Sequence, residues 1–232
     1  RKSFLNGEKA NDKLIKMARV QRSTVYMDTI ISPSITSALA QSLQVPGISG
    51  VNNNTAMFEL SEHDGAEEIK EVVDGCLFAS STLMSLLVLR HGDLHFGECR
   101  SIHIWLTWND KNNANLMVLL AYILLGHPDW SDAEICVFAA LPSNQVAEER
   151  GEFERLMSQG RIPISEKNVR FFPVDDAQSF RKLVESRSSD ADLVVVGFDL
   201  KGLKDRQIEV FSAHPTLRSV LFVQAAELIE IE

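Results

Sequence analysis

Short apolar runs of the kind that form buried strands alternate with helical segments along most of this chain. The clearest run is Leu193-Val194-Val195-Val196, in which no polar residue interrupts the apolar side chains. Continuous apolar runs are typical of strands covered on both faces, as in a parallel sheet between two helix layers. The strands are predicted at residues 24–31, 55–60, 85–90, 101–108, 133–141, 168–174, 192–198 and 219–224.

The segments between these runs carry helix signals. Ser32 and Pro33 predict a helix start, with serine as the cap and proline at the first helical position. Asp64 with Glu67 three residues later resembles a capping box, and apolar residues at helical spacing follow it. Further helices are predicted between residues 143 and 160, around Phe180 and Leu183, and around Ile208 and Phe211.

Residues 114–125 form the most apolar helical segment. Asn112 or Asn113 can cap its start, while Gly126 and Pro128 mark its end. Because this segment is apolar nearly all round, we expect it to be buried on several sides, under a second helix layer or another subunit. Its continuous apolar run is about half of the roughly 20 residues that a bilayer span requires.

Strand–helix alternation over the whole chain predicts a doubly wound α/β fold, with mostly parallel sheets and helices on both faces. The polar stretch 92–98 between two predicted strands is the best candidate boundary. We therefore expect an N-terminal α/β subdomain at residues 1–97 and a C-terminal one at residues 98–232. Since the chain begins with arginine rather than methionine, we expect it to be a piece of a longer protein.

The charge and the cysteines restrict the possible partners and the compartment. The net charge of −9 disfavours nucleic acid and anionic membrane surfaces, so nucleic-acid binding is not expected. Direct membrane insertion is not expected either, because the longest apolar run is too short to span a bilayer. The three cysteines, Cys76, Cys99 and Cys136, fit no zinc spacing. The apolar surroundings of Cys76 and Cys136 are typical of buried free thiols, which predicts a cytosolic location.

Phosphate-binding and nucleophile motifs are missing from the sequence. Neither G-x-G-x-x-G nor G-x-x-x-x-G-K-[ST] occurs, and no G-x-S-x-G elbow precedes a helix. Gly47-x-x-Gly50 could cradle a phosphate, but a simple glycine turn explains it better. Met117, a soft metal ligand in principle, is better explained as a core residue of an apolar helix.

The candidate acid–base and metal residues also have simpler explanations. His91 and His95 are four residues apart, but Gly92 lies between them and no third ligand is evident. The pair Asp175-Asp176 precedes a helical segment and is predicted to cap it. His103 lies in a predicted strand, where a hydrogen-bonded structural role is the better interpretation. We therefore expect no catalytic residue, no metal site and no cofactor.

A stretch in the middle of the chain resembles a known family. Residues 102–110 read I-H-I-W-L-T-W-N-D, residues 119–124 read L-L-A-Y-I-L, Trp130 follows, and residues 135–138 read I-C-V-F. This series resembles the pattern I-D-V-W-W-x-x-x-D-G-G, L-L-P-Y-L-L, Trp and L-R-I-F of the cation–chloride cotransporters, within the amino acid–polyamine–organocation superfamily.

Further matches follow in the family's order. Residues 47–55, G-I-S-G-V-N-N-N-T, resemble G-L-G-G-x-K-P-N-T, and residues 190–196, D-A-D-L-V-V-V, resemble D-S-D-L-V-V-L. The final segments, L-R-S-V-L-F-V and E-L-I-E-I, resemble L-x-R-V-L-L-V and E-V-I-T-I. The matching positions, for which the resemblance implies structural roles, are Gly47, Gly50, Asn54, Thr55, Trp105, Asp110, Leu119, Leu120, Tyr122, Trp130, Asp192 and Arg218.

The sequence also departs from the family pattern. Leu106 replaces a tryptophan, Ala121 replaces a proline, and Asn52-Asn53 stand where the family has Lys-Pro. The glycine pair after Asp110 is absent. The chain therefore resembles a divergent member of the family.

The resemblance implies a soluble domain at the cytoplasmic face of a membrane, built from two subdomains similar to universal stress proteins. It implies a regulatory and dimerising role in a symporter of Na⁺, K⁺ and Cl⁻, with the chain's own transmembrane domain and a second copy as partners, and no catalysis or ion conduction by this domain. The alternative is a stand-alone nucleotide-binding module like an ATP-binding universal stress protein. Its pattern G-x2-G-x9-G-[ST] begins at Gly47 and Gly50, but Leu60 occupies the third glycine position.

Overall fold

The structure is a computed structural model. It describes residues 2–20, 29–44, 53–93, 96–144, 146, 150–151 and 166–227. The chain divides into two compact units, Arg1–Asn53 and Asn54–Glu232. Among the described residues, no helix combines the length and apolar character needed to cross a bilayer.

The described part of the first unit contains two helices, α1 (Lys2–Val20) and α2 (Ile35–Gln44). Helix α1 was not among the predicted elements. Helix α2 begins later than predicted, because Ser34 rather than Ser32 caps it: the Ser34 hydroxyl accepts a hydrogen bond from the Ser37 amide at 3.2 Å. Of the strand predicted at residues 24–31, the described part, residues 29–31, is not a strand.

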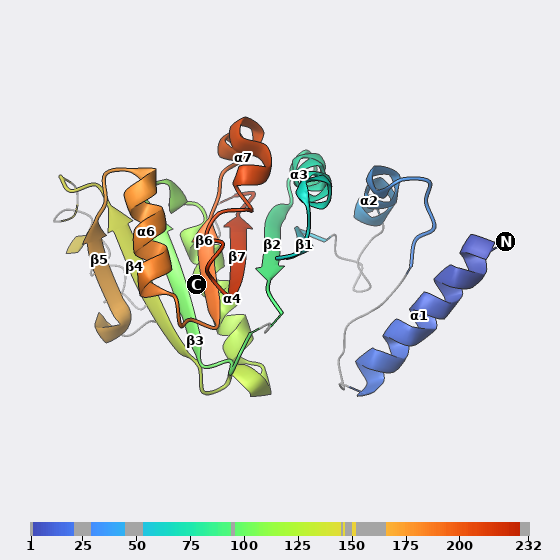
Figure 1. The fold of residues 1–232 in the computed structure, drawn as a ribbon, viewed down its shortest axis with the longest axis horizontal. Helices are drawn as coiled ribbons and strands as arrows, with labels where there is room; N and C mark the ends of the chain where they lie inside the picture. Colours follow the sequence, from blue (N-terminus) through green and yellow to red (C-terminus); the bar gives the residue numbers. More distant parts are fainter. Residues whose placement is uncertain are drawn as a thin grey trace. The chain divides into compact units, whose positions relative to one another are not determined.

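The second unit is built on one seven-stranded sheet with the order β1-β2-β7-β6-β3-β4-β5 (Figure 1). Every predicted strand from residue 55 onward is present, with ends within two residues of the prediction. The bounds are β1 (Thr55–Ser61), β2 (Ser85–His91), β3 (Ser101–Thr107), β4 (Glu134–Leu141), β5 (Val169–Pro173), β6 (Leu193–Gly197) and β7 (Ser219–Gln224).

The sheet is mostly parallel, and its one antiparallel contact corrects the predicted domain boundary. Five neighbouring strands run in the same direction, in the order β7, β6, β3, β4 and β5. Strand β2 pairs antiparallel with β7, and β1 pairs parallel with β2. The boundary predicted at 97/98 therefore falls inside a single sheet. Backbone hydrogen bonds between β2 and β7 join the two predicted subdomains, and the units instead meet at Asn53 and Asn54.

Helices lie on both faces of the sheet, as predicted. The described helices of this unit are α3 (Ala66–Ser80), α4 (Ala114–Leu125), α6 (Ala177–Arg187) and α7 (Leu200–Arg206), with 3-10 turns η1 (Trp108–Asp110), η2 (Pro128–Trp130), η3 (Glu166–Asn168) and η4 (Gln207–Glu209). Helix α7 begins before the segment predicted around Ile208, while most of the helix predicted at residues 143–160 lies outside the described residues.

The two faces of β3 show why the sequence pattern is continuous rather than alternating. Ile102, Ile104 and Leu106 point to one face, where they pack with the buried side of α4. Trp105 points to the other face and stacks on Phe138 of β4, with ring centroids 4.6 Å apart. Both faces are buried at the centre of the strand, where Ile104, Trp105 and Leu106 form a continuous apolar run.

Candidate functional site at the carboxyl edge of the sheet

A cavity of about 370 Å³ lies at the carboxyl ends of the parallel strands, which are β7, β6, β3, β4 and β5 in sheet order. Strand order reverses between β3 and β6, since β3 leads to β4 on one side and β6 leads to β7 on the other. Ligands of open α/β sheets bind at such a reversal. The cavity is lined mainly by residues that follow β3, β4, β5 and β6, including Thr107, Trp108, Asp110, Asp175, Asp176 and Asp199.

Asp110 is the buried polar centre of this edge, with 5% of its surface exposed. Its carboxylate accepts hydrogen bonds from the Thr107 amide at 2.9 Å, the Thr107 hydroxyl at 2.5 Å and the Asn113 side-chain amide at 3.0 Å. Burial raises the pKa of Asp110, and the hydrogen bonds from Thr107 and Asn113 oppose that rise. The fold thus holds a carboxyl group at the floor of the cavity.

Asn113 connects the ends of three strands. It precedes α4 as predicted, but its side chain does not cap that helix. The side-chain amide donates to Asp110 and to the Phe198 carbonyl at 3.2 Å, and its oxygen accepts from the Ala225 amide at 2.9 Å. The segments after β3, β6 and β7 are therefore joined by one buried amide. Because the partners are 85 and 112 residues away, the sequence alone gave no sign of them.

Gly197, at the end of β6, is required by this packing. A Cβ at this position would overlap the carboxylate of Asp110 and lie 3.0 Å from the Asn113 side-chain nitrogen. A larger residue would displace the buried carboxylate or break its hydrogen bonds. The glycine therefore allows the Asp110 carboxylate to lie directly against the backbone of β6. This role becomes apparent only when β3 and β6 are paired.

The turn after β6 differs from a phosphate-binding loop. Asp199 caps α7, and its carboxylate accepts a hydrogen bond from the Gly202 amide at 2.7 Å. A phosphate at a helix start would use such free amides. The chain's own carboxylate occupies this position. Arg181 and Arg206 line the cavity as well, but they face four aspartates there.

Asp175 and Asp176 lie at the mouth of the cavity. Asp176 caps α6 as predicted, accepting from the Ser179 amide at 2.8 Å. Asp175 has a different role from the predicted one: it accepts from the Ser143 amide at 2.9 Å and the Ser143 hydroxyl at 2.7 Å. The hydrogen bonds from the Ser143 amide and hydroxyl lower the pKa of Asp175, and those from the Ser179 hydroxyl, at 2.6 Å, and the Ser179 amide lower the pKa of Asp176. Both therefore add negative charge to the mouth at neutral pH.

His214 forms part of the cavity wall and is held by a buried arginine. Arg90 of β2 donates hydrogen bonds to the carbonyls of Phe211, Ala213 and His214, the last at 2.6 Å. The His214 backbone is left-handed, with φ of 57°. Burial, with Arg181 and Arg90 nearby, lowers the pKa of His214 to about 4. The imidazole is thus neutral at physiological pH.

Two residues of the family-like motifs meet at the opposite edge of the sheet. Arg218 Nη1 lies 2.8 Å from Asp192 Oδ1, and Asp192 is 5% exposed. The same carboxylate accepts from the amides of Glu98, Arg100 and Ser101, at 3.2, 2.7 and 3.2 Å. Asp192 therefore fixes the chain entering β3 to the start of β6. In this structure the contacts of Asp192 join elements of the fold.

Trp105 lies in an aromatic cluster on one face of the sheet. Its side chain is fully buried, and its indole nitrogen donates to the Ser188 hydroxyl at 2.9 Å. His103 Nδ1 lies 2.9 Å from the same hydroxyl, and burial lowers the pKa of His103. The hydrogen-bonded structural role predicted for His103 is confirmed. The contribution of Ser188 was missed, because nothing in the local sequence indicates that it faces the sheet.

The other predicted residues are distributed over the unit. Trp130 is buried beside Phe96, whose ring centroid is 5.5 Å away. Asn54 and Thr55 lie at the start of β1, where the Asn54 carbonyl accepts from the Ser85 amide at 2.8 Å. Leu119, Leu120 and Tyr122 are half-buried on α4, Met117 is fully buried in the core, and Gly47, Gly50 and His95 lie outside the described residues.

His91 and the cysteines take structural positions. His91 Nε2 lies 2.8 Å from Glu59 Oε1 on the neighbouring strand. Cys76 is fully buried in α3, and burial raises its pKa to about 12, so its thiol is unreactive at neutral pH. All three cysteines are free thiols.

The comparisons with known proteins support the fold. Neither a family model nor a curated protein matches the sequence. Among solved structures, the cytoplasmic domain of a prokaryotic cation chloride cotransporter matches with a TM-score of 0.62 and 17% identity, covering 93% of this chain and 80% of that chain. This chain has the fold of that cytoplasmic domain.

Universal stress proteins share the same fold. A putative universal stress protein from Pseudomonas aeruginosa matches with a TM-score of 0.58 and 16% identity, over 93% of this chain and 77% of that one. A universal stress protein from Archaeoglobus fulgidus matches with a TM-score of 0.55 and 11% identity, over 93% and 76%. The predicted α/β fold is confirmed, with one seven-stranded sheet in place of two separate subdomains.

Proposed function

We propose that this chain is the cytosolic regulatory and dimerisation domain of a cation–chloride cotransporter, joined to its own transmembrane domain and neither catalytic nor ion-conducting. The observation that carries the proposal is the likeness to a cotransporter's cytoplasmic domain over 93% of the chain. The family-like motifs fall on structural positions of that same fold. In particular, Asp192 and Arg218, from two separate motifs, form an ion pair.

The charge of the sheet-edge cavity favours this role over nucleotide binding. Asp110, Asp175, Asp176 and Asp199 line the cavity, against Arg181 and Arg206. A nucleotide polyphosphate would meet more negative than positive side chains there. It would also have to displace the Asp199 carboxylate from the start of α7.

A stand-alone nucleotide-binding module remains the second candidate, and the cavity at the strand reversal is the observation in its favour. Calorimetric titration of the chain with ATP separates the two functions. We expect no binding in the low micromolar range, which corresponds to about −8 kcal/mol. Saturable binding of ATP at such concentrations would replace the main proposal by the second.

Helix α4 supports dimerisation. Its 12 residues include no charged side chain, and Ile123 is 62% exposed. Leu119, Leu120 and Tyr122 are only half-buried. Exposed apolar surface of this kind is typical of contact sites, and a single self-complementary patch is sufficient for a twofold dimer. We therefore expect a second copy of the chain to cover α4.

Sedimentation equilibrium over a wide concentration range tests the dimer. We expect a weak, concentration-dependent dimer of the 25.9 kDa chain, because in a whole transporter the membrane part would raise the local concentration of the subunits. Ile123→Glu should abolish the association. Leu83→Glu is the matched control, since Leu83 is 82% exposed in the turn between α3 and β2. A monomer up to millimolar concentration would refute the dimer. Equal dimerisation of the Ile123→Glu variant would refute α4 as its contact surface.

A further inference from the structure

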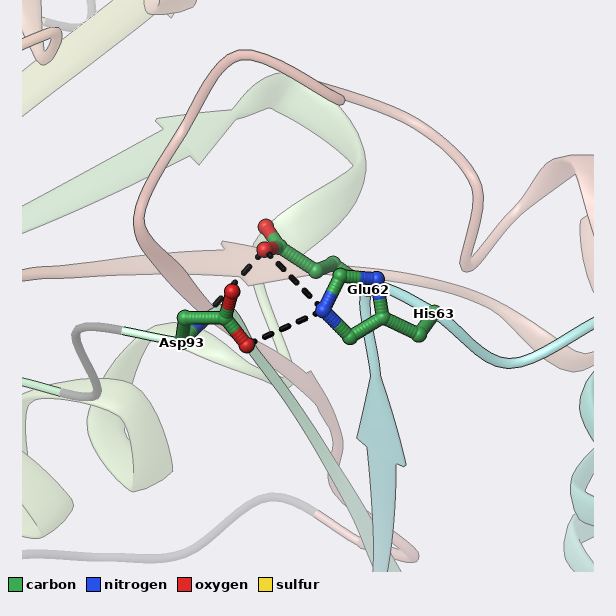
Figure 2. A group of neighbouring side chains, drawn as sticks. All are labelled: Glu62, His63 and Asp93. Atoms are coloured by element: carbon green, nitrogen blue, oxygen red, sulfur yellow. Dashed lines mark hydrogen bonds and ion pairs between the residues drawn. The ribbon is translucent and has the colours of Figure 1, made fainter.

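The pairing of β1 with β2 brings three metal-ligating side chains together at the ends of these strands. The strands are parallel and in register, with Ser61 opposite His91. The residues that follow each strand therefore emerge side by side: Glu62 and His63 after β1, and Asp93 after β2. Figure 2 shows their side chains converging on one point from two separate turns.

The distances between the donor atoms suit a single ion. His63 Nε2 lies 2.9 Å from Asp93 Oδ1 and 3.8 Å from Glu62 Oε1. All three ligand atoms lie within 4.8 Å of one another. Ligands on a tetrahedral zinc ion, with bonds of about 2.1 Å, are about 3.4 Å apart. Small side-chain rotations are sufficient to place the three atoms around one ion.

The backbone holds the two turns in place. The Glu62 amide donates to the His91 carbonyl at 2.9 Å, which extends the pairing of β1 and β2 beyond the strands. Gly92 leaves room for the Glu62 carboxylate, because a Cβ at this position would lie 2.5 Å from Glu62 Oε2. The Asp93 amide lies 3.4 Å from Glu62 Oε1 and orients that oxygen. The glutamate is thus positioned by the partner turn that supplies the aspartate.

We propose that Glu62, His63 and Asp93 bind a divalent transition-metal ion, with Zn²⁺ as the best fit. One imidazole nitrogen and two carboxylate oxygens match the donors that zinc accepts, whereas Ca²⁺ and Mg²⁺ prefer oxygen alone. Two carboxylates also balance the charge of a divalent cation. The three side chains are exposed by 68%, 43% and 78% in the order His63, Glu62, Asp93, so an ion reaches them freely.

The ion would cross-link the turn after β1 to the turn after β2. Helix α3 separates these strands in the sequence, so no short hairpin joins the two turns. Three protein ligands leave a fourth position on the ion for water or for a side chain from another molecule. Binding should therefore raise the thermal midpoint of the chain, because the ion binds only when both turns are in their folded positions.

Titration with ZnCl₂ alone, after removal of metal with a chelator, tests the site by calorimetry. We expect one Zn²⁺ ion per chain, and an affinity at least about tenfold lower for His63→Ala and for Asp93→Asn. His127→Ala is the matched control: His127 is exposed and has Asp129 at 3.7 Å, but this pair has no third ligand in the described part of the chain. The control should bind zinc as the unaltered chain does.

A thermal melt with and without Zn²⁺ provides a second measurement. The rise in midpoint should appear in the unaltered chain and in His127→Ala, and should be lost in His63→Ala. All substituted side chains are exposed, so the variants are expected to fold normally. Absence of zinc binding by the unaltered chain, or equal binding by His63→Ala, would overturn the proposal.

Discussion

Replacing His214 by asparagine should change how the stability of the chain depends on pH. His214 is 5% exposed, and its Nδ1 has no hydrogen-bond partner among the described residues. Arg90 and Arg181 lie nearby, while Glu185 Oε1 is 4.0 Å from Nδ1, too far for a hydrogen bond. Protonation of the folded state is therefore opposed by burial and by two positive charges. Asparagine removes the titration and tolerates the left-handed backbone at this position.

The size of the effect follows from the lowered pKa. The pKa of His214 falls from 6.5 in the unfolded chain to about 4 in the folded one. Between these two values the unfolded state binds a proton that the folded state does not, so stability falls as the pH is lowered. At 1.36 kcal/mol per unit, the loss reaches about 3 kcal/mol near pH 4. Above pH 6.5 both states are neutral at this residue, and the effect vanishes.

Urea unfolding at a series of pH values from 7.5 to 4, followed by tryptophan fluorescence, measures this loss. The quantity to compare is the difference in unfolding free energy between the original chain and His214→Asn. All other titrating groups cancel in that difference, including Asp110, whose raised pKa acts with the opposite sign. We expect the original chain to lose about 3 kcal/mol relative to the variant as the pH falls to 4. Parallel pH profiles for the two proteins would refute the reasoning.

Three further substitutions test the packing by the midpoint of denaturant unfolding. Trp105→Ala should cost about 3–5 kcal/mol of unfolding free energy, because it removes the ring that stacks on the aromatic residues of this face of the sheet. Trp108, which is 36% exposed, is the control: an equal cost for Trp105→Ala and Trp108→Ala would contradict the burial of Trp105. Gly197→Ala should cost about 1–3 kcal/mol through its overlap with Asp110, and a neutral result would mean that the carboxylate can move away. Asp192→Ala should cost about 2–4 kcal/mol, because it removes the buried acceptor of the Arg100 and Ser101 amides and the ion-pair partner of Arg218. A change below about 0.5 kcal/mol would show that water replaces the carboxylate.

The candidate site was only partly visible in the sequence. Asp176 was correctly predicted as a helix cap, because a cap and its amides are close in sequence. Asp110 was selected by its place in a motif, but its burial was not predicted. Asn113 and Gly197 were missed as site residues, since their roles exist only when the ends of β3, β6 and β7 meet.

The sequence by itself determined the local elements of the second unit. The run from Leu193 to Val196 became β6, and α4 ends at Gly126 as its end signals predicted. Such features depend on side-chain periodicity and backbone preference over a few residues, so they can be predicted without knowledge of the fold. The start of α3 lies one residue later than predicted. The capping pair is Gly65 and Glu68 rather than Asp64 and Glu67.

Only the tertiary structure decided how these elements combine. The predicted boundary at 97/98 was not found, because β2 pairs with β7, more than 120 residues away, and so joins both halves in one sheet. The same pairing places the Arg90 side chain under His214, and the pairing of β1 with β2 places Asp93 beside His63. Strand partners are chosen by which buried faces and hydrogen-bonding edges fit together across the whole chain. That choice is a property of the packed fold, and no local stretch of sequence contains it.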